Sequence, residues 1–151
     1  MVKILVGQEE VNPYKPDQHG QTPLSQAAIG GHECVVQILL ARKDVNPEKP
    51  DNCGRIPFFL TANRGHEGVM KILLGREEVN PDQRDILGRT PLSFAAQDGL
   101  EAVVKILLRR EEVNPNHPDN DSRTPLRWAT SYGHRRIEAL LFCRNHNGPI
   151  T

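Results

Sequence analysis

Apolar residues occur in short blocks that return at a fixed interval along the chain. The longest part of each block, such as Val103 to Leu108, is apolar around nearly the whole circumference of a helix. A shorter segment of apolar and small residues, such as Leu92 to Ala96, precedes it. Stretches rich in proline, asparagine, aspartate and glycine separate the blocks and predict turns. The pattern therefore predicts pairs of short helices connected by projecting turns.

The interval between equivalent residues is 34. The motif Val-Asn-Pro begins at Val11, Val45, Val79 and Val113, and the prolines that open the first helix of each pair are Pro23, Pro57, Pro91 and Pro125. A fixed period of this size indicates an array of stacked repeats, in which each repeat buries apolar surface against its neighbours.

The third copy contains Thr90-Pro91-Leu92, then the small pair Ala95-Ala96, then Gly99 before its apolar helix, where other copies have Gly-His. This pattern resembles the ankyrin repeat and covers essentially the whole chain. The resemblance implies an all-α fold, an α-solenoid of helix-turn-helix repeats with projecting hairpin-like turns. The period is one residue longer than the usual 33. Near-identical copies of Glu-Glu-Val-Asn-Pro also resemble the arrays of large fungal multidomain proteins.

We expect a single repeat domain over residues 1–151. Residues 1–13 match the second half of a repeat, because Lys3 to Leu5 and Gly7 align with Lys71 to Leu73 and Gly75. They indicate either a truncated repeat or a natural half-repeat cap. Four repeats follow, over residues 14–47, 48–81, 82–115 and 116–151, the last including a C-terminal cap. Glu138 indicates that cap, because it replaces an apolar residue at a stacking position.

Ile56, Ser122 and Phe59 are further departures from the repeat. Ile56 replaces the threonine that should cap the first helix, and an uncapped helix start costs about 1 kcal/mol. Ser122 replaces the turn glycine of the other copies, which carries a penalty if that position needs a positive φ. Phe59 stands where other copies have serine, so it either packs between repeats or faces a partner.

Charge and cysteine content narrow the class of protein. The 19 basic and 19 acidic residues cancel, so no net field draws the chain to nucleic acid or to a membrane. The three cysteines have no CxxC spacing, which favours reduced thiols and a cytoplasmic protein, with the nucleus as the alternative. No apolar run reaches the length of a membrane span.

Residues that could carry chemistry recur once per repeat. We expect His32, His66 and His134 to bond loop carbonyls, because no second metal ligand lies at the spacing that a zinc site needs. Asp17, Asp51, Asp85 and Asp119 precede the turn tip, where an aspartate typically accepts hydrogen bonds from backbone N–H groups. No catalytic or phosphate-binding motif is present. We therefore expect no enzyme activity, no cofactor and no metal.

Positions that vary between copies are not constrained by the stacking of the repeats, so they can carry binding specificity. They fall at the turn tip and at the end of the first helix, which the ankyrin resemblance places together on a concave, protein-binding face. The predicted protein-binding residues are Gln18, His19, Gln21, Asn52, Cys53, Arg55, Arg64, Ile86, Leu87, Arg89, Asp98, Asn120, Asp121, Arg123 and Tyr132. Their arginines, tyrosine and apolar pair are residue types that interfaces favour. Phe94 and Trp128 are expected to lie in the core between repeats.

These features predict a non-catalytic protein–protein interaction module with a protein partner. The alternative is a structural spacer or capping segment of a larger array. We expect a monomer, although edge-to-edge association through the truncated N-terminus is possible. Ile86 and Leu87 form the one apolar pair among the four turn tips, so they either anchor a partner or fold back against their neighbours.

Overall fold

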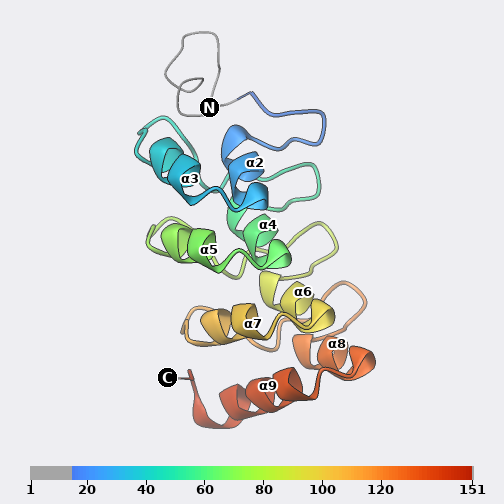
Figure 1. Ribbon diagram of the computed structural model, residues 1–151. Helices are drawn as coiled ribbons and strands as arrows, with labels where there is room; N and C mark the ends of the chain where they lie inside the picture. The colour runs from blue at the N-terminus through green and yellow to red at the C-terminus, as the bar shows by residue number, and fades with distance from the viewer. Residues whose placement is uncertain (1–14, 151) are drawn as a thin grey trace. The chain divides into compact units, whose positions relative to one another are not determined.

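The computed structural model describes residues 15–150 and divides into two compact units, residues 1–80 and 81–151. Eight helices and no strand occur in this described part of the chain (Figure 1). The fold class is therefore all-α, built from repeated helix pairs as predicted. The partial repeat expected over residues 1–13 lies outside the described residues.

The first unit contains two helix pairs. Helices α2 (Pro23–Gly30) and α3 (Glu33–Leu40) form one pair, and α4 (Pro57–Arg64) and α5 (Glu67–Leu74) form the other. Like helices pack together, α2 on α4 and α3 on α5. The buried side chains Phe58, Phe59, Leu39 and Leu73 fill the core. Phe59 is completely buried, so its aromatic ring serves packing and does not face solvent.

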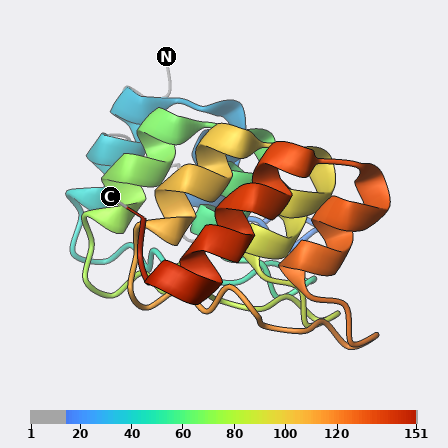
Figure 2. The same ribbon diagram turned by 90° about the horizontal axis from the view of Figure 1, so that it is seen from below.

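The second unit repeats this arrangement. Helices α6 (Pro91–Asp98) and α7 (Glu101–Leu108) precede α8 (Pro125–Tyr132) and the longer α9 (Arg135–Asn147). Helix α6 packs on α8, and α7 lies beside α9 (Figure 2). Leu92, Leu107 and Leu141 are completely buried between them. The second helices are thus covered on more than one side, as their apolar circumference predicted.

Threonine hydroxyls begin three of the four first helices. The hydroxyls of Thr22, Thr90 and Thr124 each accept a hydrogen bond from the backbone N–H three residues later, and proline occupies the first helical position. Ile56 has the same extended backbone at the start of α4 but supplies no such bond. The uncapped start predicted for this helix is confirmed.

The turn before each first helix contains a residue in the left-handed region. Gly88 has φ +75° in the third repeat, and Ser122 has φ +62° at the same position of the fourth. A side chain in this conformation normally costs about 1 kcal/mol, and glycine avoids that cost. A Cβ atom at Gly88 would in addition overlap the side-chain oxygen of Asn120. The penalty expected for Ser122 is therefore present in the fold.

These two positions form a matched pair of tests. Ser122→Gly should raise the free energy of unfolding by about 0.5–1 kcal/mol, because it relieves the left-handed serine. Gly88→Ser should lower it by more than about 1 kcal/mol, because strain and overlap with Asn120 act together. Urea unfolding of the two variants measures both changes. A loss of stability in Ser122→Gly would contradict the assignment of strain to that residue.

Candidate protein-interaction surface

An aspartate organises each turn. The Oδ1 atom of Asp85 accepts hydrogen bonds from the backbone N–H groups of Leu87 and Arg89, both at 2.9 Å. Asp17, Asp51 and Asp119 accept the equivalent pairs in the other turns. The backbone bonding predicted for these aspartates is confirmed. Three of the four carboxylates are buried, Asp17 being the exposed one.

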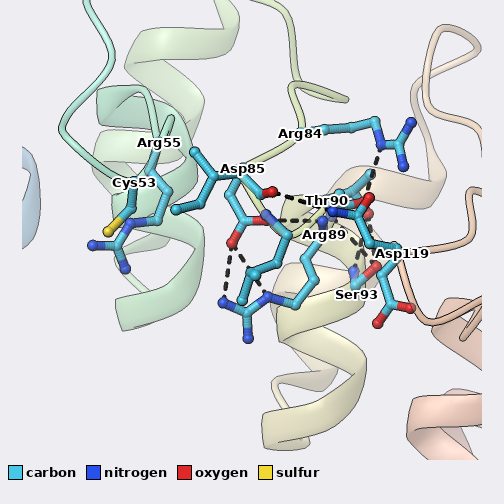
Figure 3. Close-up of polar contacts among 12 residues, drawn as sticks. Cys53, Arg55, Arg84, Asp85, Arg89, Thr90, Ser93 and Asp119 are labelled. Carbon is cyan, nitrogen blue, oxygen red and sulfur yellow. Dashed lines mark hydrogen bonds and ion pairs between the residues drawn. The ribbon is translucent and has the colours of Figure 1, made fainter.

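The second carboxylate oxygen takes an arginine from the same turn. Arg89 approaches Asp85 Oδ2 with Nε at 3.2 Å and a terminal nitrogen at 3.0 Å (Figure 3). Arg55 pairs with Asp51 in the same way. Arg123 approaches Asp119 with its Nε alone, and its terminal nitrogen pairs with Asp121. Each of these three aspartate side chains is only 1% exposed. Three arginines predicted to face a partner are therefore held by carboxylates of their own turns.

Two of these arginines stack on aromatic rings. The guanidinium carbon of Arg89 lies 4.1 Å from the ring centroid of Phe94, and that of Arg123 lies 4.1 Å from the Trp128 ring. Stacking of this kind stabilises a guanidinium while leaving its plane fixed. Trp128 also donates its indole N–H to Asp119 Oδ2 at 3.2 Å. Both rings are buried, as predicted.

The first two repeats fill these positions differently. Gln26 stands in place of the ring and donates to both Asp17 Oδ2 and Gln21 Oε1 at 2.8 Å. In the second repeat Leu60 is buried at this position. Arginine is followed five residues later by an aromatic ring in the third and fourth copies, by leucine in the second, and glutamine is followed by glutamine in the first. The last two copies carry the signal for the arginine–ring contact, which the sequence predictions missed.

Asp119 illustrates the electrostatics of the turn. Burial raises the pKa of its carboxyl, but backbone N–H groups of Arg123 and Asp121 oppose this effect. The charge of Arg123 and the Trp128 indole lower the pKa further, so it lies below its usual value. The carboxylate is therefore ionised at neutral pH and bonded on both oxygens.

Asparagines connect successive turns within each unit. Asn120 donates its backbone N–H to Leu87 O at 3.0 Å and its side-chain amide to Ile86 O at 3.2 Å. Asn52 makes the same two bonds to His19 and Gln18. Asn52 and Asn120 thus serve the array itself. Ile86 occupies the equivalent position of the third repeat, where its side chain offers no hydrogen-bonding group.

Three of the predicted residues have large apolar side chains that are exposed. Ile86 and Leu87 are 63% and 51% exposed at the tip of their turn, and Tyr132 is 57% exposed at the end of α8. The Tyr132 ring lies 6.0 Å from the Trp128 ring and stacks on His134 at 6.5 Å. Most of the surface of the apolar pair therefore remains open to solvent.

The remaining predicted residues have weaker internal partners. Gln18 and His19 are exposed and contact each other, and Cys53 is half-buried beside its turn aspartate. Arg64 and Asp98 are exposed at the ends of α4 and α6. Asp121 is exposed and pairs with Arg123.

The recurrent histidines have a structural role. His66 Nε2 lies 2.8 Å from Ile29 O, and His134 Nε2 lies 2.9 Å from Gln97 O, so each ring contacts the preceding repeat of its own unit. Both rings thus bond backbone carbonyls, but these carbonyls lie in the last turn of α2 or α6 and not in a loop, where they had been predicted. Among residues 15–150 no three His, Cys, Asp or Glu side chains are grouped to hold a metal. No helix in the same range has the length and apolar character needed to cross a membrane.

The family model for ankyrin repeats (3 copies) matches the sequence over residues 1–85 and again over residues 58–149. The two matches together span nearly the whole chain. The protein therefore belongs to the ankyrin repeat family, a class whose members generally act as protein–protein interaction modules. No curated protein matches the chain.

The turn carboxylates should make stability depend on pH. The folded-state pKa of Asp119 lies below its ordinary value of 3.8, so its contribution is complete above about pH 5 and is lost as pH falls through the folded pKa. Asp119→Asn should therefore cost about 2 kcal/mol at pH 7, and the gap from wild type should narrow below about pH 4. Denaturant unfolding at several pH values measures this gap.

Asp98→Asn is the matched control, because Asp98 is an exposed carboxylate of the same unit. It should change stability by less than about 0.5 kcal/mol at any of these pH values. A gap for Asp119→Asn that stayed constant down to pH 2.5, roughly one unit below the ordinary pKa, would show that its charge is not what stabilises the turn.

Proposed function

We propose that the chain is a non-catalytic protein–protein interaction module. Its proposed binding surface is formed by the turn tips and the ends of the first helices, the face that is concave in ankyrin arrays. The single observation that supports this proposal most is the exposed pair Ile86 and Leu87 at the tip of the third turn. We propose a protein partner and a monomeric module that needs neither cofactor nor nucleic acid.

Two adjacent exposed apolar side chains leave more burial free energy unused than a single exposed residue does. Fully burying one such side chain is worth about 1.5–3 kcal/mol, and the pair leaves most of that energy unused. The other turn tips carry polar pairs at this position, Gln18-His19, Asn52-Cys53 and Asn120-Asp121. A partner that covers the pair supplies a reason for this exposure.

The arginines were predicted to contact a partner because arginine is common in interfaces, but their contacts support a structural role. Arg89 and Arg123 each pair with a buried carboxylate and stack on a ring, which holds them rigid. A rigid surface loses little side-chain entropy on binding, which favours affinity. We therefore propose that these arginines shape the surface, while Ile86, Leu87 and Tyr132 supply most of the binding energy.

A spacer with no partner is the alternative function. It is favoured by the turn-to-turn bonds, which occupy Asn52 and Asn120, and by the internal pairing of Arg55, Arg89 and Arg123. If the chain is a spacer, Ile86 and Leu87 contact no partner, and their substitution changes no binding affinity.

Peptides selected on the full chain from a random display library distinguish the two functions. The double variant Ile86→Asn, Leu87→Ser should weaken the selected peptides about tenfold or more, as loss of an interface anchor does. Its free energy of unfolding should change by less than about 0.5 kcal/mol, because both residues are exposed. Fluorescence anisotropy measures the affinity, and urea unfolding measures the stability.

The matched control is Phe142→Ser, which removes another exposed apolar side chain, on α9. It should leave the affinity of the selected peptides unchanged. Selection that enriches no peptide, or peptides that bind the double variant as well as wild type, would favour the spacer.

A further inference from the structure

We propose that Arg84 is a positioning residue for the proposed binding surface. It holds the apolar turn tip, Ile86 and Leu87, in one conformation before a partner binds. This inference rests on the proposed function and adds how the free chain prepares that site for its partner.

Arg84 belongs to a set of departures from the repeat that fall in one turn. The other three copies have proline at the equivalent position, at Pro16, Pro50 and Pro118. Proline has no side-chain hydrogen-bond donor, so these copies cannot hold their turns by a side-chain bond from this position. Ile86 and Leu87, which replace polar pairs, follow Arg84 directly after the turn aspartate. The arginine therefore occurs in the same turn as the exposed apolar pair.

The guanidinium of Arg84 connects two successive turns of the second unit. Its Nε atom donates to Gly88 O and its Nη2 atom to Pro118 O, both at 3.0 Å (Figure 3). The first bond spans the tip, because Ile86 and Leu87 lie between Arg84 and Gly88 in the chain. The second bond joins the tip to the following turn. A Cβ atom on Gly88 would lie 2.6 Å from Arg84 Nη2, so glycine leaves room for the guanidinium.

The backbone of the tip is bonded at further points. The N–H groups of Leu87 and Gly88 donate to Asp85 Oδ1 and Asp85 O, both at 2.9 Å. Asn120 donates to the carbonyl oxygens of Ile86 and Leu87 from the other side. The Ile86 and Leu87 side chains nevertheless stay 63% and 51% exposed. The turn thus fixes the backbone of the tip and leaves its apolar side chains open.

A fixed tip favours binding because order that exists in the free chain does not have to be created in the complex. Ordering a mobile segment on binding costs conformational entropy, and this cost lowers the affinity. The carbonyl oxygens that Arg84 bonds belong to this chain, so its effect on the tip requires no contact with the partner. Arg84 acts on binding through the position of Ile86 and Leu87.

The test uses the peptides that are selected on the full chain and lose binding to the Ile86→Asn, Leu87→Ser variant. Arg84→Ala and Arg84→Lys should each weaken these peptides about threefold to tenfold, measured by fluorescence anisotropy. Lysine has a compact ammonium on a flexible stem in place of the planar fork, so it does not reproduce both bonds. It does keep the positive charge near Asp82, whose pKa burial raises and the charges of His117 and Arg84 lower. Both losses should be the same at about 50 mM and about 500 mM salt, because the bonded carbonyls are neutral.

A second measurement follows the tip in the free chain. The ¹⁵N order parameters of Ile86 and Leu87 should fall from about 0.85 in the wild type to below about 0.6 in Arg84→Ala. Arg109→Ala is the matched control, because it removes an exposed arginine of the same unit at the end of α7. It should change neither the order parameters nor the affinity.

A direct ionic contact between Arg84 and the peptides predicts a different result. Arg84→Lys would then bind as tightly as wild type, or the loss in Arg84→Ala would disappear at high salt, and either outcome overturns the positioning role and keeps the proposed function. Unchanged affinity in both variants, with a lower free energy of unfolding, would show that Arg84 is structural only and also overturns the inference. The absence of any peptides that depend on Ile86 and Leu87 overturns both the inference and the proposed function.

Discussion

Each turn of this protein depends on the carboxylate of one aspartate. One oxygen of Asp85 closes the turn by accepting two backbone N–H groups, and the other oxygen holds the arginine that follows. Without these bonds the turn would bury polar backbone groups that have no partner, at a cost of about 1–3 kcal/mol each. Because the backbone bonds recur at Asp17, Asp51, Asp85 and Asp119, the helix pairs begin in the same orientation relative to the turn before them.

This arrangement separates the residues that build the surface from those that are free to bind. The carboxylate fixes the arginine, the arginine lies on the ring, and in the fourth repeat the indole returns a hydrogen bond to the carboxylate. Both oxygens of the Asp119 carboxylate are therefore bonded within a network formed by its turn and the helix that follows. Residues outside the network, such as Leu87, Asp98 and Tyr132, can change without affecting the turn. They are therefore the natural place for specificity between family members.

The same separation explains why residue type alone is a weak guide to binding in a repeat protein. Arginine and tryptophan are common in interfaces, yet Arg89, Arg123 and Trp128 are used inside the second unit. Ile86 shows the reverse case, because isoleucine is typical of protein cores and yet this side chain is exposed at a turn tip. A buried aspartate four residues before the arginine is the feature that Arg55, Arg89 and Arg123 share, and it distinguishes a structural arginine from one available to a partner.

The sequence by itself determined the repeat, the helix pairs, the threonine caps and the roles of the turn aspartates and histidines. These features depend on contacts between residues close in the chain or between equivalent residues of identical copies, so a 34-residue period is enough to predict them. Only the tertiary structure decided which of the variable side chains are exposed to solvent and which are buried. Phe59 is buried and Ile86 is exposed although both are apolar departures from the repeat. The physical reason is that exposure depends on what the neighbouring repeat places opposite each side chain, which the period of the sequence does not specify.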